Sequence, residues 1–277
     1  MSKQNDIELI IEAGKTEKNY WKDLLEYREL FYILALRDIS VRYKQTVMGI
    51  LWAILQPFLT MIIFVVVFCK IAKLPSENIP YPIYVFSAML PWTFFSTAFS
   101  NAGNSLIANS NLISKVYFPR IIIPAASIIV SAVDFTISFV ILIGMMLWYS
   151  FYPSMYLLTI PIFLLITFFT AFGLGSFIAA LNVKYRDFKF VIPFMVQFGL
   201  FISPVAYSTT LIPEKFKLLY YINPMVSVID GFRWAVSGGK TDFRLEEVII
   251  GLVTVVILNV FGILYFRKTE KTFADVI

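Results

Sequence analysis

Blocks of apolar residues, each close to the length of a membrane-spanning helix, limit most strongly how this chain can fold. A helix needs about 20 mostly apolar residues to cross the ~30 Å hydrocarbon core of a bilayer. The blocks that approach or exceed this length are residues 49–70, 82–102, 119–149, 156–181, 189–208 and 247–266. They predict an all-α integral membrane protein with six transmembrane helices in one bundle.

The composition agrees with a membrane protein and argues against other classes. The chain is 59% hydrophobic and 15% charged, whereas soluble domains carry roughly 25% charged residues. It has no histidine, the commonest metal ligand and general base, so we expect neither a metal site nor a catalytic residue. The single cysteine, Cys69, allows no intrachain disulfide.

Basic residues indicate how the spans are oriented. With six spans both termini lie on one side, and that side carries sixteen of the 23 Lys and Arg residues. Because Lys and Arg accumulate in cytoplasmic loops, we expect both termini in the cytoplasm. The same rule accounts for the basic pI, so we expect no nucleic-acid partner. Residues 1–19 are expected to be a flexible terminus and residues 267–277 a cytoplasmic tail.

Residues 20–47 precede the first span and lack an 18-residue apolar run. Their apolar residues recur at helical spacing and comprise Trp21, Leu24, Leu25, Phe31, Tyr32, Ala35, Ile39 and Tyr43. This pattern predicts an amphipathic helix that lies in the membrane interface and contacts lipid. The alternative is a soluble surface helix.

The stretch 213–238, between the fifth and sixth spans, is apolar but interrupted by Asn223, Pro224, Asp230, Gly231 and Arg233. We expect two short helices that form an external re-entrant hairpin, which membrane proteins tolerate only against protein or a water-filled cavity. Asp230 and Arg233 have i, i+3 spacing and can pair on one helix face. The pair either holds the hairpin's geometry or acts in gating.

Two further patterns suit a transporter better than an enzyme. Asp134 is the only carboxylate well inside an expected span, which makes it a functional candidate, although a structural role facing the bundle is favoured. The sequence SGGKT (237–241) resembles the end of a phosphate-binding loop, but Trp234 occupies the position of the required first glycine. An ATP-driven process would therefore need a partner chain that binds the nucleotide.

The stretch KVYFPRIIIP (115–124) joins a polar loop to the third span. Pro119 lies where a helix would begin, and Lys115 and Arg120 would lie at headgroup level. The preceding residues 101–114 predict a short amphipathic helix on the cytoplasmic surface. The segment is either a solvated turn with basic anchors or a docking segment for a cytoplasmic partner.

Several sequence blocks together resemble one protein family. They are YREL (27–30), RDISVRYKQTVMGILWAILQPF (37–58), NSNLISKVYFPRIIIP (109–124), NVKYRDF (182–188), SPVAY (203–207) and YINPM (221–225). In this order, and at these positions relative to the spans, they resemble the membrane subunit of ABC-2-type polysaccharide exporters. That family includes permeases for lipid-linked O-antigen, with relatives that handle capsule and teichoic acid.

The resemblance implies a homodimer in the bacterial cytoplasmic (inner) membrane, with two copies of a cytoplasmic ATP-binding subunit. ATP and Mg would be bound by that partner, and no cofactor by this chain. The substrate would be an undecaprenyl-diphosphate-linked polysaccharide. The segment before Lys115 would couple to the ATPase, and its candidate residues are Asn104, Ser105, Leu106, Ile107, Asn111, Leu112 and Lys115.

Candidate substrate contacts follow from chemistry and depth. Charge favours four residues for the lipid diphosphate: Arg37, Arg42, Lys44 and Arg120. These cations could equally anchor helices to anionic lipid. Candidates for lining or gating a channel are Phe94, Phe198, Phe201, Tyr207, Tyr220, Tyr221, Asp230 and Arg233. Aromatic faces suit sugar rings, although interfacial belts and packing also explain many aromatic residues.

Two other functional classes remain as alternatives. A membrane glycosyltransferase or polymerase would need carboxylates or histidine in a cleft, usually in long loops, which this chain lacks. An ion-driven secondary transporter would need coupled ionisable residues in mid-membrane, and only Asp134 is present.

Overall fold

The computed structural model describes residues 20–44, 47–71, 73, 79–185, 187–241 and 243–273. Its side chains are described except at 47–50 and 52–54. The expected flexible terminus (1–19) and the last residues of the expected tail (274–277) lie outside the described residues. In the described part, the chain forms helices joined by short turns, with no strand.

The helices follow the predicted blocks closely. In chain order they are α1 (Tyr20–Glu26), α2 (Arg28–Tyr43), α3 (Val47–Phe64), η1 (Val65–Ile71), α4 (Tyr81–Ala108), α5 (Ser110–Ile113), α6 (Ile122–Trp148), η2 (Met155–Thr159), α7 (Ile160–Lys184), α8 (Phe188–Ile202), η3 (Thr209–Leu211), α9 (Glu214–Tyr220), α10 (Pro224–Ser237) and α11 (Leu245–Glu270).

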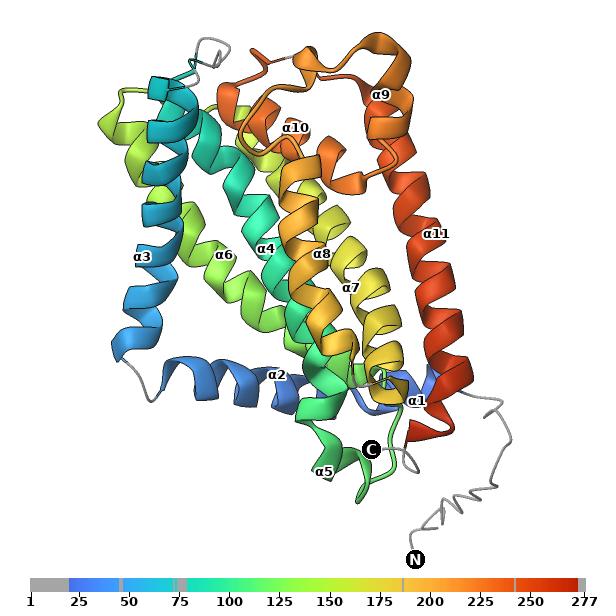
Figure 1. Ribbon diagram of the computed structural model, residues 1–277. Coiled ribbons are helices and arrows are strands. Elements are labelled where there is room, and N and C mark those ends of the chain that lie inside the picture. The colour runs from blue at the N-terminus through green and yellow to red at the C-terminus, as the bar shows by residue number, and fades with distance from the viewer. Residues whose placement is uncertain are drawn as a thin grey trace, which may run out of the picture.

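Four helices in the described chain are long and apolar enough to cross a membrane: α4, α6, η2 with α7, and α11. Shorter apolar helical stretches, Leu55–Ile71 and Phe188–Ile202, occupy the places of the two other expected spans. In Figure 1, α3 and α11 stand on opposite flanks, and α4 runs through the middle. Accordingly, 78% of the most apolar part of α4 is buried, against 22% for α11.

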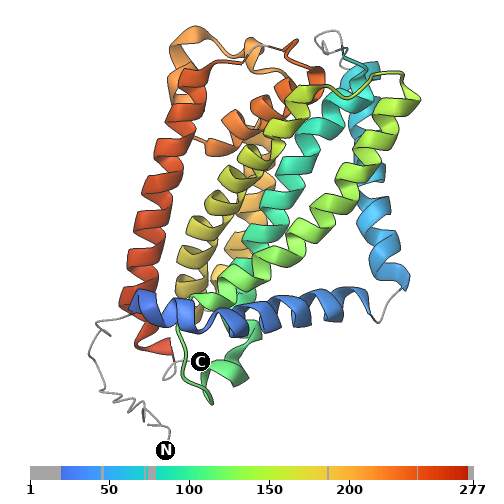
Figure 2. The same cartoon turned by 180° about the vertical axis from the view of Figure 1, so that it is seen from behind.

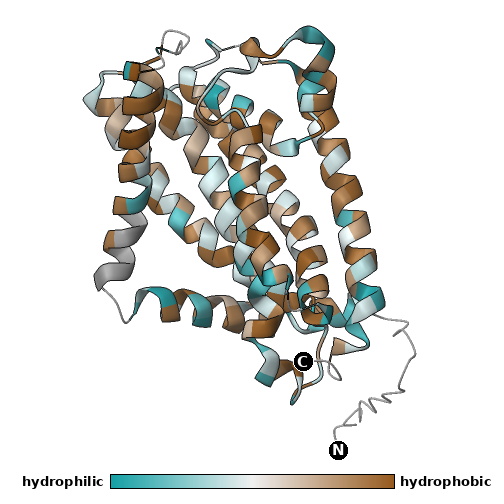
Figure 3. Ribbon diagram, in the orientation of Figure 1, coloured by the Kyte–Doolittle hydropathy of each residue, from teal (hydrophilic) through white to brown (hydrophobic). Residues whose placement is uncertain are grey.

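The two ends of the bundle differ in structure. Helices α1 and α2 lie across one end, here called the α2 end, and α5 projects beyond them (Figures 1 and 2). Helices α9 and α10 lie at the opposite end, here called the α9 end. Figure 3 shows hydrophobic residues along the long helices and hydrophilic ones gathered toward both ends, as expected for a chain that crosses a bilayer.

The helix predicted over 20–47 is present as two helices that break at Tyr27. Leu34 and Ala35 of α2 are buried against the bundle. Trp21 and Tyr32 of the predicted apolar stripe are exposed. Part of the predicted apolar stripe therefore packs on protein, and the remaining part is exposed at the surface.

The structure differs from the prediction at 101–114. Instead of a separate surface helix, α4 continues to Ala108, and only the four-residue α5 follows. The extension packs inside the bundle, since Leu106 is fully buried and Asn182 of α7 donates to the Gly103 carbonyl at 3.1 Å. Some of the polar Asn and Ser residues of this stretch therefore contact other parts of the bundle instead of facing solvent.

The stretch 213–238 contains the two short helices that its sequence predicts. Asn223 caps α10 by accepting from the Met225 main-chain N–H at 3.1 Å, and Pro224 occupies its first turn. Gly238 ends the helix with φ +71°, a left-handed conformation that suits glycine. Nearly all of α10 is buried against α4, α7 and α11.

Candidate functional site

A cavity of about 210 Å³ opens between α3, α4, α6 and α8. Its lining combines charged, amide, hydroxyl and aromatic side chains, namely Arg42, Gln56, Pro57, Thr60, Phe64, Met89, Trp92, Thr93, Phe94, Ser96, Thr97, Ser131, Asp134, Phe135, Ser138 and Leu200. This mixture is unusual in a bundle whose other surfaces are mostly apolar. The cavity is therefore the leading candidate site for a polar ligand.

The hydroxyl groups on the α4 wall of this cavity donate their protons to carbonyls of the same helix. Thr93 donates to the Leu90 carbonyl at 2.9 Å, and Thr97 donates to the Thr93 carbonyl at 2.8 Å. Ser96 donates in the same way to the Thr93 carbonyl at 3.1 Å. Because these protons are used within the helix, the oxygens offer lone pairs to the cavity. A ligand rich in hydrogen-bond donors, such as a polyhydroxylated one, fits that wall.

An ion pair closes the α2 side of the cavity. The Arg42 guanidinium of α2 lies 2.6 Å from an Asp134 carboxylate oxygen on α6, and the Tyr43 hydroxyl donates to the other oxygen. Burial, and then the hydrogen bond to Asp134, raise the pKa of Tyr43 well above its ordinary value, so the hydroxyl stays protonated. Asp134 thus ties α2 to α6, which agrees with the favoured structural role.

The four cations considered for the diphosphate do not meet in one place. Arg42 lines the cavity, and Lys44 is exposed just after α2. Arg37 binds Asp38 and the Asn109 side-chain oxygen, both at 2.7 Å. Arg120 instead contacts the end of α11: its main-chain N–H donates to Glu270 at 2.6 Å, and its guanidinium donates to the Glu270 carbonyl.

A buried polar network fixes the α9 end. Arg233 of α10 is 3% exposed and lies 3.9 Å from Asp230. Its guanidinium donates to the carbonyls of Val205 at 2.9 Å and Tyr207 at 3.0 Å, and stacks 3.9 Å above the Tyr84 ring. The pair predicted from i, i+3 spacing therefore also holds the non-helical SPVAY segment (203–207) that follows α8.

Tyrosines complete this network. Tyr221 donates to Asp230 at 3.2 Å, and the hydroxyls of Tyr207 and Tyr220 lie 2.9 Å apart. Burial raises the pKa of Tyr220 first, followed by the hydrogen bond with Tyr207, so the hydroxyl remains protonated. These side chains connect α9 and α10 to the end of α8.

Comparison with known proteins assigns the family. The profile of the ABC-2 type transporter family matches residues 29–236, which is most of the chain and includes the cavity and the polar network. The chain belongs to the ABC-2 type transporter family. Members of this family are permease subunits of ABC transporters, and this chain is accordingly a multi-pass membrane protein.

Relatives from three bacteria cover most of the chain. The O-antigen export system permease protein RfbA of Klebsiella pneumoniae is 28% identical over 250 residues, 90% of this chain and 95% of the relative. The protein of the same name from Myxococcus xanthus is 27% identical over 215 residues, 76% and 82% of the two chains. The polysialic acid transport protein KpsM of Escherichia coli is 24% identical over 243 residues, 86% and 92%.

The candidate coupling residues of this ABC-2 protein lie at the tip of the α2 end. Asn104, Ile107, Asn111 and Lys115 are exposed, and Leu112 is half-buried. Ser105 and Leu106 point into the bundle, where Ser105 donates to the Ala102 carbonyl at 2.7 Å. One face of the segment is therefore exposed, and the other face packs against the bundle and holds the segment in place.

The aromatic candidates are divided between three environments. Phe94 lines the cavity and packs on Phe135, with ring centroids 5.8 Å apart. Phe198 and Phe201 are exposed on α8. The tyrosine candidates belong to the polar network at the α9 end.

Our sequence reasoning missed the polar wall of the cavity. Thr93, Ser96 and Thr97 lie at i, i+3 and i+4 within the expected second span. That spacing places them on one helix face, which is the signal that could have found the wall. The neighbouring Trp92 lines the same cavity.

Proposed function

We propose that this chain is the permease subunit of an ABC exporter that moves lipid-linked polysaccharide, O-antigen first, across the cytoplasmic membrane. The energy comes from ATP hydrolysed by a separate subunit. The observation that carries the proposal is the family match over residues 29–236, joined with near full-length relatives named as O-antigen export permeases. The match to KpsM keeps capsular polysaccharide as the second candidate, with teichoic acid behind it.

The proposed protein crosses the membrane six times, with both termini in the cytoplasm. Helix α3 and η1 together run from Val47 to Ile71, and 25 residues at about 1.5 Å each exceed the ~30 Å core. Helix α8 is shorter, and the SPVAY segment that follows it continues toward the α9 end. Lys22, Lys44, Lys184 and Lys268 at the α2 end support placing that end in the cytoplasm.

The cavity is the proposed start of the polysaccharide pathway. Its acceptor-rich α4 wall matches sugar hydroxyl donors, and the rings of Trp92 and Phe94 suit the apolar faces of sugars. Arg42 lies at the cavity's α2 side, where the diphosphate of a lipid-linked substrate would reside. Charge-assisted contact there would orient the polymer with its lipid end at the interface.

A second copy of the chain is proposed to complete the pathway. Helices α3 and α8, which border the cavity, expose large apolar side chains: Phe58, Leu59, Ile62, Ile63, Phe194, Phe198 and Phe201. A homodimer with two ATP-binding subunits would place these faces opposite each other. The polymer would then thread between the protomers.

Coupling to the ATPase is proposed to run through α4. This helix is unbroken from Tyr81 to Ala108, so it links the exposed Ile107 directly to the cavity wall at Thr97 and Thr93. Ile107 and Thr97 are ten positions apart, about 15 Å along the axis. An ATPase subunit that pushes the tip formed by Asn104–Lys115 would move the wall as one rigid element.

The α9 end is proposed to act as the external gate. Helices α9 and α10 form the re-entrant hairpin, and α10 is held by the Asp230–Arg233 network. Opening would require this network to move together with the SPVAY segment. Because a packed, buried network is either formed or broken, such a gate would have one closed and one open arrangement without intermediate ones.

Deletion of the chain from its bacterium tests the function. We expect lipid-linked polysaccharide to accumulate inside the cell and to disappear from the surface, and plasmid-borne wild type to restore export. Analysis of the accumulated sugars distinguishes O-antigen from capsule and from teichoic acid. Normal surface polymers with no internal accumulation would contradict the proposal.

A further inference from the structure

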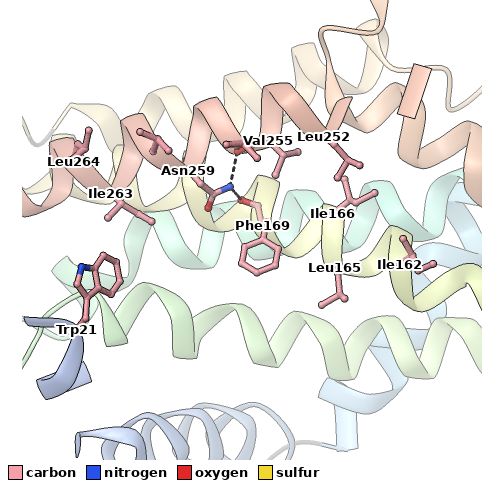
Figure 4. A pocket seen from close by; sticks show the side chains of 12 residues that line it. Trp21, Ile162, Leu165, Ile166, Phe169, Leu252, Val255, Asn259, Ile263 and Leu264 are labelled. Atoms are coloured by element: carbon pink, nitrogen blue, oxygen red, sulfur yellow. Dashed lines mark hydrogen bonds between the residues drawn. The ribbon is translucent and has the colours of Figure 1, made fainter. Parts of the chain in front are cut away.

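A second, larger groove lies on the outer face of α7 and α11 (Figure 4). It measures about 630 Å³, three times the polar cavity. It is lined by Trp21, Ile162, Leu165, Ile166, Phe169, Leu252, Val255, Val256, Asn259, Val260, Ile263 and Leu264. Among these described residues, Asn259 carries the only amide, and it donates to the carbonyls of Phe169 and Val255 at 2.9 and 2.8 Å. The groove therefore presents an almost wholly apolar wall.

The length of the groove matches one leaflet of a bilayer. Its lining on α11 runs from Leu252 to Leu264, about 18 Å at 1.5 Å per residue. Half of a hydrocarbon core of ~30 Å is about 15 Å. Val256 and Val260 are exposed, so the groove opens toward lipid rather than toward the bundle. An extended acyl chain can follow it from end to end.

The α2 end of the groove carries positive charge. Trp21 of α1 borders that end, and the Arg267 guanidinium carbon lies 6.0 Å from its ring centroid. Arg267 also stacks 4.4 Å from the Tyr20 ring. Lys268, the next residue of α11, is exposed. Since tryptophan is enriched at membrane–water interfaces, this end lies at headgroup depth.

The nearby acidic groups do not cancel this charge. Glu270 accepts hydrogen bonds from the Tyr20 hydroxyl at 3.1 Å and from the Arg120 main-chain N–H at 2.6 Å, and its charge interacts with the guanidinium groups of both Arg120 and Arg267. Helix α1 carries Lys22, Asp23 and Glu26, a net charge of −1. The cations Arg120, Arg267 and Lys268 outnumber these negative charges and leave a net charge of +1, so this end of the groove attracts a phosphate.

We propose that the groove binds one anionic phospholipid, with an acyl chain along α7 and α11 and its headgroup beside Arg267 and Lys268. A transmembrane helix of a partner protein is about 10 Å wide. Only one row of its side chains would therefore enter the groove. A flexible acyl chain can fill its whole length. The bound lipid would join α1 to α11, because its headgroup and chain contact both helices. This site goes beyond the transport function and holds for any exported polymer.

Quenching of Trp21 tests the site in the full-length chain. The protein is reconstituted in zwitterionic nanodiscs that contain increasing fractions of phosphatidylglycerol brominated on its acyl chains, or of matched brominated phosphatidylcholine. The difference between wild type and Trp21→Phe isolates the Trp21 signal. Two cations near a surface each favour an anionic lipid by about fivefold. Together they favour it by about 25-fold, so we expect half-quenching at a fraction of the anionic lipid about 25-fold lower than that of the zwitterionic lipid.

Paired variants separate the site from general lipid contact. Lys268→Gln should reduce the preference for the anionic lipid about fivefold, whereas Lys189→Gln, exposed on α8, should leave it unchanged. Val260→Phe should fill the groove and weaken quenching by both lipids. Val253→Phe is its control, because Val253 is 54% exposed on α11 but does not line the groove, while Val260 is 53% exposed.

Three results would overturn the proposal. Equal quenching by both brominated lipids would mean ordinary annular lipid. Quenching that survives Val260→Phe unchanged would place the quenching lipid outside the groove. Absence of Trp21 quenching would mean that something other than lipid, such as a protein helix, covers the groove.

Discussion

Replacing Arg233 by methionine should destabilise the α9 end strongly. The guanidinium is 3% exposed, faces Asp230 at 3.9 Å and donates to the carbonyls of Val205 and Tyr207. The substitution leaves Asp230 without its cation and removes the donors of two carbonyls. Breaking a buried pair by removing one partner costs about 3–5 kcal/mol. We expect Arg233→Met to lose stability in that range.

A double variant identifies the cause. Asp230→Asn combined with Arg233→Met removes the uncompensated charge, so it should recover about 1–3 kcal/mol relative to the single variant. Stability is measured by tryptophan fluorescence during unfolding in mixed detergent–SDS micelles. Arg244→Met, at an exposed cation of the same end, should change stability by less than about 0.5 kcal/mol. A loss below 1 kcal/mol for Arg233→Met, or a double variant no more stable than the single, would refute this reasoning.

Two other predictions follow from close packing and from the exposed tip. A Cβ at Gly262 would lie 2.2 Å from the Gly173 carbonyl oxygen, so Gly262→Ala should cost about 1–3 kcal/mol in the same unfolding assay. Gly144→Ala meets no heavy atom within 4 Å and should be neutral or stabilising by up to about 1 kcal/mol; equal effects at both sites would contradict the packing. Ile107→Asp, at a position 42% exposed, should abolish co-purification of the proposed ATP-binding subunit. Leu218→Asp, exposed at the α9 end, should retain it, and a subunit that remains bound to Ile107→Asp would exclude this tip as the docking point.

Hydrophobic blocks predicted the long helices well. The third block, 119–149, was confirmed as a helix with bounds Ile122–Trp148, and the last, 247–266, as α11. The length of apolar residues needed to cross a bilayer sets these bounds, so local sequence contains the information. The sequence did not predict that Asn104–Ala108 continues α4, because the polar residues of this stretch, taken alone, are typical of a surface helix. Packing of Leu106 and the contact from Asn182 make it part of α4.

Partners far apart in the sequence could not be predicted. Asp134 was recognised as unusual, but its contacts with Arg42 and Tyr43 join residues more than 90 positions apart. Spacing predicted that Asp230 and Arg233 could pair, yet nothing local shows that Arg233 also holds the carbonyl of Val205. Such contacts depend on how helices cross, which side-chain periodicity alone does not determine.

ATP-driven translocation in proteoliposomes tests the central claim most directly. The chain is reconstituted with its ATP-binding subunit, so that this subunit faces outward, together with the lipid-linked polymer that accumulates in the deletion strain. Protection of the sugar from an added glycosidase reports its entry into the lumen. We predict that ATP increases the protected fraction, and that an ATPase-inactive partner abolishes the increase. A complex that hydrolyses ATP but leaves the protected fraction unchanged would contradict the account.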